Sequence, residues 1–260
     1  MIDYHVHTSL CDHATGTPQE YIEKAIEAEL FEIGFSDHAP LPLHLRQNIT
    51  MEPEETEAYV AMLQELTDKY PVAVKIGFEV DYPLHPTFDT RYLNDRRLDY
   101  IIGSCHFIGD WPFDHPAFVD EYTKRDINQV YRDYYHIVYD MVATGMFDII
   151  GHFDLVKKFG YRATADLNTE IEPILQLAAQ QSTAIEINTS GWRKPVKEAY
   201  PSFEIIQKMF QYNVPITLGS DAHAPEEVAY NFYEALSLIK QAGYRKIVGY
   251  RKRKQYTITF

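Results

Sequence analysis

The chain has 260 residues, of which 45% are hydrophobic and 24% are charged, so it has enough apolar material for a buried core. Its formal net charge of −14 argues against nucleic acid and anionic membrane surfaces as partners. The two cysteines, Cys11 and Cys105, are too few for a disulfide framework and indicate a reducing compartment. No apolar run approaches the roughly 18 residues that span a membrane, and the first residues lack the apolar stretch of a cleaved signal. We therefore expect a soluble, cytoplasmic protein, whose oligomeric state the sequence leaves open.

Short apolar runs, typical of strands, alternate along the chain with amphipathic stretches that are typical of helices. The predicted strands cover residues 2–6, 32–35, 72–80, 100–105, 148–151, 184–188 and 214–219. The predicted helices begin near Thr17-Pro18 and then cover residues 54–70, 87–96, 127–144, 169–180, 202–212 and 226–242. This alternation favours parallel βα units, and seven or eight units in 260 residues suit a closed barrel better than an open sheet. No Gly/Ser/Pro-rich linker divides the chain, so we predict a single α/β domain over residues 1–260.

The first predicted strand carries two histidines in the stretch Asp3-Tyr4-His5-Val6-His7. Side chains two apart in a strand point to the same face, so both imidazoles could close on one metal ion. Asp3 lies on that face too, where it could support a ligand or accept a ring N–H.

Candidate ligands recur where the other predicted strands end. In a βα barrel the reactive groups lie at the C-terminal ends of the strands, and six of the seven predicted strands deliver a His, Asp or Glu there. The sixth strand instead delivers Glu186 and the polar run from Asn188 to Arg193. The candidate metal ligands are His5, His7, His13, His38, Glu79, His106, His152, Asp221 and His223.

One ion cannot use nine side chains, whereas two or three divalent ions could share them through bridging carboxylates. Glu79 is the expected bridge, and Asp221 would bridge or bind end-on. A set rich in imidazole favours Zn, Fe or Mn over Mg or Ca and leaves the metal's identity open. Clustered ions suit hydrolysis of a phosphate ester, and we expect a metal-bridging hydroxide to attack phosphorus.

Several segments together resemble the PHP (polymerase and histidinol phosphatase) superfamily. They are Asp3 to Thr8, Ser36-Asp37-His38, Gly77 to Asp81, Gly103 to Phe107, Gly151 to Asp154 and Gly219 to His223. The resemblance spans Asp3 to about Tyr244 and is closest to stand-alone histidinol-phosphate phosphatases, on the segments Gly103 to Phe113, Lys157 to Arg162 and Asn188 to Pro195.

This resemblance implies a distorted (β/α)7 TIM-like barrel with a trinuclear metal centre, and hydrolysis of L-histidinol phosphate in histidine biosynthesis. It also implies how the ligands are shared among the ions. One ion would take His5, His7, Glu79 and Asp221, a second Glu79, His106 and His152, and a third His13, His38 and His223.

The substrate would be a small phosphate ester, and arginine offers a two-pronged fit to phosphate oxygens. Arg162 and Arg193 follow the fifth and sixth strands, and the resemblance favours phosphate contact for both. We expect Lys158 and Lys194 to be solvated. Asp154, like Asp37 and Asp81, would support an imidazole or donate a proton to the leaving group. Two loops, Leu41 to Pro53 and Trp111 to Phe118, are candidate lids.

Two alternatives remain open at this point. The first is a related phosphoesterase that acts on phosphotyrosine, a nucleotide or another small ester. The second is a non-catalytic metal-binding module, which the presence of all nine candidate ligands disfavours.

Overall fold

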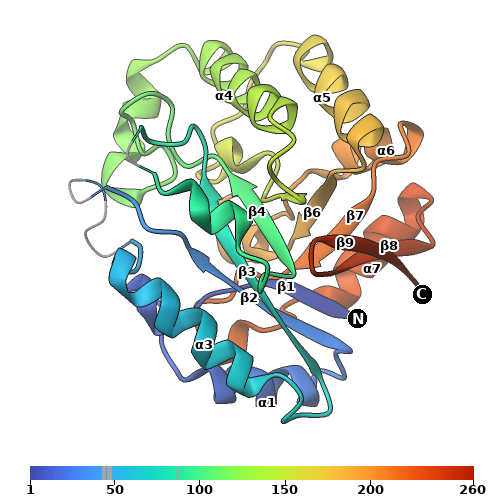
Figure 1. The fold of residues 1–260 in the computed structure, drawn as a ribbon. Helices are drawn as coiled ribbons and strands as arrows, with labels where there is room; N and C mark the ends of the chain where they lie inside the picture. Colours follow the sequence, from blue (N-terminus) through green and yellow to red (C-terminus); the bar gives the residue numbers. More distant parts are fainter. Residues whose placement is uncertain (43–44, 46–48, 87) are drawn as a thin grey trace.

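Seven parallel strands form a nearly closed barrel in the computed structural model of the protein, which describes residues 1–42, 45, 49–86 and 88–260 (Figure 1). The strands are β1 (Ile2–Val6), β2 (Glu32–His38), β3 (Ala73–Asp81), β4 (Tyr100–Ser104), β5 (Ile149–Ile150), β6 (Ala184–Asn188) and β7 (Ile216–Gly219). Each strand pairs in parallel with the next along the chain. The first strand meets the end of the last where the backbone N–H of His7 donates to the Ala222 carbonyl at 2.9 Å and the Ala222 N–H donates to the His5 carbonyl at 3.1 Å. The predicted (β/α)7 barrel is therefore confirmed.

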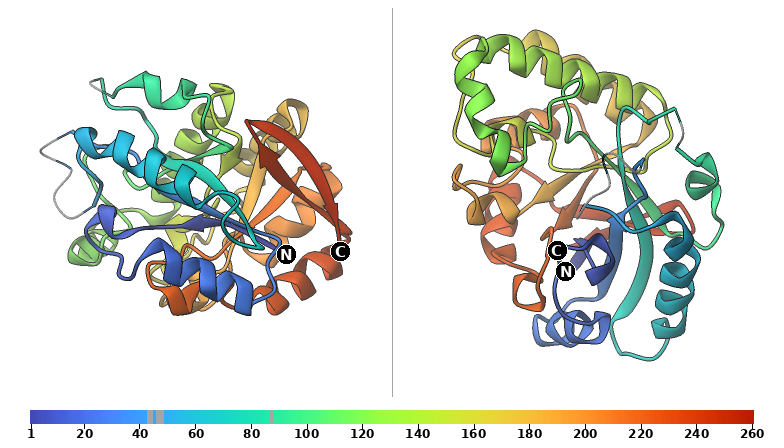
Figure 2. Two further views of the ribbon diagram at one scale, coloured as in Figure 1. Left: turned by 60° about the horizontal axis from the view of Figure 1, so that its bottom comes forward. Right: turned by 90° about the vertical axis from the view of Figure 1, so that its left-hand side faces the viewer.

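Helices cover the outside of the barrel, as two further views show (Figure 2). They are α1 (Pro18–Glu27), α3 (Thr56–Leu66), α4 (Ile127–Ala143), α5 (Asn168–Gln181), α6 (Phe203–Gln211) and α7 (Phe232–Ala242). Helix α1 begins as the sequence predicts, because Thr17 and Glu20 form a capping box around Pro18. Helix α7 ends at Gly243, which takes a left-handed φ of 119° that suits glycine. Among the described residues, no helix is long and apolar enough to cross a bilayer.

Two of the predicted helices are wrong in extent. The prediction over 226–242 merges a short 3₁₀ turn, Pro225–Glu227, with α7. The two are separate because Ala229 and Asn231 both take positive φ angles, and the Ala229 N–H donates to Asp3 at 3.0 Å. The prediction over 87–96 gives only a 3₁₀ turn, Thr90–Asn94, while Thr87 lies outside the described residues. Part of the predicted loop from Leu41 to Pro53 also lies outside them.

An antiparallel hairpin, β8 (Lys246–Arg251) and β9 (Lys254–Thr259), covers the end of the barrel where the strands begin. At its turn, the backbone N–H of Arg253 donates to the carbonyl of Asp99, directly before β4, at 2.9 Å. Tyr250 donates its hydroxyl to the carbonyl of Asp148, directly before β5, at 2.8 Å. The predicted strands do not include β8. In each view the hairpin lies beside the N-terminus (Figures 1 and 2).

A buried polar cluster lies beneath this hairpin. The hydroxyls of Tyr4 and Tyr256 both donate to the carboxylate of Glu32, and Lys75 lies 3.5 Å from the same carboxylate. The Tyr4 hydroxyl also accepts the backbone N–H of Tyr250 at 3.0 Å. Every polar side chain of this lower cluster (Tyr4, Glu32, Lys75 and Tyr256) thus has a partner within the protein.

Candidate metal centre

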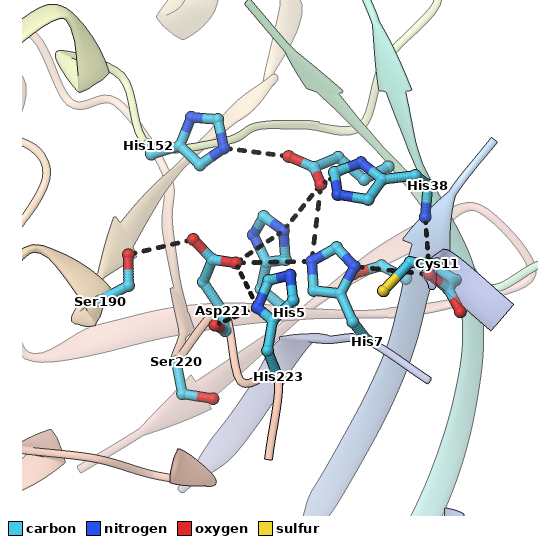
Figure 3. Close-up of polar contacts among 12 residues, drawn as sticks. His5, His7, Cys11, His38, His152, Ser190, Ser220, Asp221 and His223 are labelled. Carbon is cyan, nitrogen blue, oxygen red and sulfur yellow. Dashed lines mark hydrogen bonds and ion pairs between the residues drawn. The ribbon is translucent and has the colours of Figure 1, made fainter. Parts of the chain in front are cut away.

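Seven of the nine candidate ligands line one cavity at the end of the barrel where the strands finish. The other two, His5 and His7, are buried beside it, against Glu79 and Asp221. His5 and His7 come from β1, His38 from β2 and Glu79 from β3. The remaining ligands lie in loops that follow the 3₁₀ turn Ser9–Cys11 and strands β4, β5 and β7. Figure 3 shows His5, His7, His38, His152, Asp221 and His223 converging from these different elements. The parallel sheet explains this, because it brings all strand C-termini to one rim.

Glu79 lies at the centre of the set. Its Oε2 is 3.0 Å from His38 Nδ1, 3.3 Å from His5 Nε2 and 3.6 Å from His7 Nε2. Its Oε1 is 3.0 Å from His152 Nε2 and 3.6 Å from His106 Nε2. One buried carboxylate therefore faces imidazoles from four other strands or strand ends, as expected of a bridging ligand.

Asp221 lies against the histidines at the end of β1. Its Oδ1 is 3.4 Å from His7 Nε2 and 3.5 Å from His223 Nδ1. The rings of His223 and His7 stack with centroids 4.1 Å apart, and the ring of His13 stacks on His223 at 4.6 Å.

Other carboxylates hold the imidazoles in orientation. Asp81 Oδ1 is 2.7 Å from His106 Nδ1, which matches the supporting role predicted for Asp81. Asp37 Oδ1 lies 3.5 Å from His7 Nδ1 but makes no hydrogen bond with it. Glu186 supports His5, at 2.7 Å from Nδ1, and also accepts the backbone N–H of His152 at 2.8 Å. No role is predicted for Glu186 from the sequence. Its position on β6, two residues before Asn188, is the feature that could have indicated one.

The predicted acceptance of a ring N–H by Asp3 is wrong, whereas the predicted support of a ligand agrees with its contacts. The Asp3 carboxylate accepts backbone N–H groups from Ser220 at 2.9 Å and Ala229 at 3.0 Å. It therefore fixes the loop that carries Asp221 and His223.

The charges of the cluster are strongly coupled. Burial would raise the pKa of Glu79 and Asp221, but His5 and the neighbouring imidazoles outweigh it and hold both carboxyls well below their usual range. Burial would lower the pKa of His5, but Glu186, Glu79 and Asp221 raise it well above its ordinary value. For His38, burial dominates and lowers the pKa well below the ordinary value. The anionic carboxylates thus require positive charge beside them, which divalent cations could supply in place of protons.

Several buried ring nitrogens have no hydrogen-bond partner, which indicates that these side chains bind a ligand. Among the described residues, His5 Nε2, both ring nitrogens of His7, His38 Nδ1 and His152 Nδ1 are buried and make no hydrogen bond. Leaving such groups unpaired is costly. Several triads place their ligand atoms within 4.8 Å of one another, including His5 with His7 and Asp221, His5 with Glu79 and His152, and His13 with His38 and His223. The side chains present therefore fit metal ions.

The cavity above these side chains has a volume of about 520 Å³. Lys158, Lys194, Asp114 and His115 also line it, so the predicted solvation of both lysines is wrong. Lys158 Nζ lies 3.0 Å from Asp114 Oδ2. Burial lowers the pKa of Lys194, and the neighbouring cations Lys158 and Arg193 act in the same direction. The loop from Trp111 to Phe118 borders the cavity through Pro112, Asp114, His115 and Pro116.

Asp154 and Arg162 lie in a separate ion-pair cluster and are not among the residues that line the cavity. Buried Lys157 joins this cluster, with its Nζ 2.8 Å from Asp154 and 2.7 Å from Glu198. Arg162 pairs with the same Glu198 at 2.9 Å. These positions do not match the predicted contact of Arg162 with phosphate, or the predicted role of Asp154 beside an imidazole. Asp154 instead fixes the chain after β6, because it accepts the backbone N–H of Ser202 at 2.9 Å.

Arg193 lies behind the rim. Its Nη2 donates to the carbonyls of Ser220 at 3.0 Å and Asp221 at 2.9 Å, and its Nε is 3.1 Å from Glu227. It is not among the cavity-lining residues, although Asp221 and Glu227 are. Arg193 therefore holds the backbone that presents Asp221.

Residues 3–190 match the PHP domain family. The chain belongs to the PHP family. The matched region extends from β1 to the turn after β6 and contains seven of the nine candidate ligands, all except Asp221 and His223.

Relatives of this PHP protein carry closely related names. It is 40% identical over 264 aligned residues to a protein of Deinococcus radiodurans named "Probable histidinol-phosphatase", with 98% of each chain covered. It is 27% identical to a histidinol-phosphatase of Bacillus subtilis, with 90% of this chain and 97% of the relative covered.

Among solved structures, histidinol phosphate phosphatase from Lactococcus lactis has a similar fold. The TM-score is 0.77, the sequences are 24% identical, and 98% of each chain is covered. That crystal structure is described as a complex with zinc, L-histidinol and phosphate. At this identity the similarity establishes the fold of the present PHP protein.

Proposed function

We propose that the protein is a metal-dependent phosphomonoesterase that hydrolyses L-histidinol phosphate to L-histidinol and phosphate. The observation that carries this proposal is a single cluster of nine potential metal ligands, seven of which line one cavity together with two lysines. The names of the similar proteins from Deinococcus radiodurans and Bacillus subtilis support the substrate.

In this proposal the nine side chains hold two or three divalent ions at the rim. The triad of His13, His38 and His223 would hold one ion. The triads that join His5 to Asp221 and to Glu79 would hold the others, with Glu79 shared between them and His106 beside it. Ions bound there supply Lewis acidity to phosphoryl oxygens and lower the pKa of water. Mixed imidazole and carboxylate ligands favour Zn, Fe or Mn.

Lys158 and Lys194, instead of Arg162, are the side chains that we assign to the phosphate. Both line the cavity, and an ammonium group forms charge-assisted hydrogen bonds with phosphate oxygens. The Arg162 guanidinium is half exposed and already paired with Glu198. Arg193 supports the centre indirectly, through its bonds to the backbone around Asp221.

Asp114 is the group that we assign to the cationic part of the substrate. L-histidinol carries an amine and an imidazole, and a carboxylate in the cavity suits either one when protonated. Burial would raise the pKa of Asp114, but Lys158, His106 and His152 outweigh it and keep the carboxyl ionised. The cavity thus offers cations for the phosphate and an anion for the amine end.

Steady-state kinetics of the metal-loaded protein test the substrate. We expect kcat/KM to be highest for L-histidinol phosphate in a panel that includes phosphotyrosine and a nucleoside monophosphate. Equal or better kcat/KM for another ester would contradict the proposed substrate, while no hydrolysis of any ester would favour the non-catalytic module.

Variants of Asp114 sharpen this test. Asp114→Asn should raise KM for L-histidinol phosphate more than for para-nitrophenyl phosphate, which has no amine. The matched control is Asp120→Asn, in the exposed part of the 3₁₀ helix Pro116–Lys124, which should change neither value. An equal change for both substrates would exclude a role of Asp114 in recognising the amine end.

A further inference from the structure

Cys11 places a sulfur atom beside the imidazole cluster. It ends the 3₁₀ turn Ser9–Cys11, between the histidines at positions 7 and 13, and its side chain is fully buried. Figure 3 shows its sulfur next to the ring of His7. The ligand atoms of Cys11, His7 and His223 all lie within 4.8 Å of one another. A thiolate and two imidazoles are a ligand set typical of zinc and other soft cations.

The state of His7 is a second, independent indication of a ligand. The His7 ring is 0% exposed, and neither of its nitrogens makes a hydrogen bond among the described residues. The nearest carboxylate oxygens, on Asp221 and Asp37, lie 3.4 Å and 3.5 Å away. A buried imidazole that has two unpaired nitrogens is unfavourable without a partner. His7 could therefore offer one nitrogen toward Glu79 and Asp221, or join the sulfur of Cys11.

The other cysteine lacks these features. Cys105 is also buried, but its thiol donates to the carbonyl of Phe107 at 3.4 Å. The adjacent His106 directs its Nδ1 to Asp81 at 2.7 Å. Cys105 is therefore a matched control for a buried thiol whose partner is supplied by the protein.

We propose that Cys11 is a metal ligand and that, together with His7 and His223, it binds a thiophilic divalent cation such as Cd²⁺ or Zn²⁺. Binding forms a sulfur–metal bond and releases the thiol proton to solvent, with no change in oxidation state. The inference rests on the proposed function only in that His7 and His223 also belong to the proposed catalytic set. An ion held through Cys11 withdraws these two imidazoles from that set, so excess thiophilic cation should inhibit turnover.

Cadmium binding to the full-length, chelator-treated protein tests this proposal without an activity assay. Wild type and Cys105→Ser should develop a thiolate-to-cadmium charge-transfer absorption in the ultraviolet as Cd²⁺ is added. Cys11→Ser should lack the band and bind Cd²⁺ about 10-fold to 100-fold more weakly. Absence of the band in wild type, or its persistence in Cys11→Ser, would overturn the proposal.

A measurement on unmodified protein keeps the test valid if Cys11→Ser does not fold. X-ray absorption of wild type loaded with an excess of Zn²⁺ over the proposed catalytic ions should show a sulfur neighbour at about 2.3 Å. A shell of nitrogen and oxygen alone would reject Cys11 as a ligand. The kinetic panel tests the proposed function independently of this measurement. If the protein hydrolyses L-histidinol phosphate but shows no sulfur neighbour, only the role of Cys11 is refuted.

Discussion

The two ends of the barrel bury polar side chains in opposite ways. Where the strands begin, the lower cluster satisfies itself, since the hydroxyls of Tyr4 and Tyr256 donate to Glu32 and the Tyr4 oxygen accepts from Tyr250. Where the strands finish, ring nitrogens of His5, His7, His38 and His152 have no hydrogen-bond partner among the described residues. Both ends therefore bury polar groups. Only the end where the strands finish carries buried histidine nitrogens without a hydrogen-bond partner among the described residues, as expected of a metal-binding site.

The largest effect should come from the carboxylate at the centre of the upper end. Glu79→Gln removes the charge that faces five imidazoles and should lower kcat by on the order of 10³-fold, with a loss of bound metal. Elemental analysis together with turnover checks this. Full turnover with unchanged metal content in Glu79→Gln would refute a bridging role.

Two adjacent lysines provide the next comparison, because Lys158 lines the cavity and Lys157 lies buried in the ion-pair cluster with Asp154. Lys158→Met should lower kcat/KM about 10-fold to 100-fold by removing a charged hydrogen bond to phosphate, with little change in stability. Lys157→Met should instead lower the free energy of unfolding by about 3–5 kcal/mol, since it leaves the buried Asp154 carboxylate without its cation, while Glu198 keeps Arg162. Kinetics and chemical denaturation of both variants would show whether the two effects separate.

Arg162, like Lys157, lies in the ion-pair cluster and not among the residues that line the cavity. Arg162→Ala should leave kcat/KM within about threefold of wild type, because an exposed ion pair contributes roughly 0–1 kcal/mol. A loss as large as that of Lys158→Met would restore the direct phosphate contact that the sequence analysis predicts for Arg162.

At the lower end, Glu32→Gln should affect stability alone. The variant weakens the acceptor of the buried Tyr4 hydroxyl and the half-buried Tyr256 hydroxyl, so we expect a loss of about 1–3 kcal/mol in the free energy of unfolding. Steady-state kinetics should be unchanged. A fall in kcat comparable to that of Glu79→Gln would mean that the two ends are not functionally distinct.

A further prediction concerns the pH dependence of stability in metal-free protein. Burial would lower the pKa of His106, but Asp81 and Glu79 raise it from 6.5 to about 10. The folded state thus holds this proton more tightly than the unfolded state. The resulting stability is fully present below pH 6.5 and is lost as pH rises toward 10. Asp81→Asn should therefore be less stable than wild type at pH 6, by about 1.4 kcal/mol for each pKa unit that Asp81 contributes.

Denaturation curves of chelator-treated wild type and Asp81→Asn at pH values across this window measure the difference. The gap between the two proteins should narrow as pH rises. A gap that stays constant would show that Asp81 does not hold a proton on His106.

The barrel and its rim could be predicted from the sequence because both depend on short-range patterns. His5 and His7 share a face through the period of two in a strand, and parallel strands bring their C-terminal ends to one side. The orientation of loop side chains could not be predicted in this way. Lys157 and Lys158 diverge at the end of the 3₁₀ turn Leu155–Lys157, so one joins Glu198 and the other faces the cavity.

Long-range partners were missed for a related reason. Glu186 supports His5 from a strand 181 residues away, and Asp3 holds Ser220 across 217 residues. Neither pairing leaves a local pattern. Both pairings depend on the closure of the barrel, which brings β1 beside β7 and His5 within 2.7 Å of Glu186 on β6.

The most direct test of the metal centre is the metal dependence of L-histidinol phosphate hydrolysis, measured with metal content on the same samples. The account predicts two or three divalent ions per chain, loss of turnover when a chelator removes them, and recovery when Zn²⁺ or Mn²⁺ is returned. Undiminished turnover in protein from which every ion has been removed would contradict it.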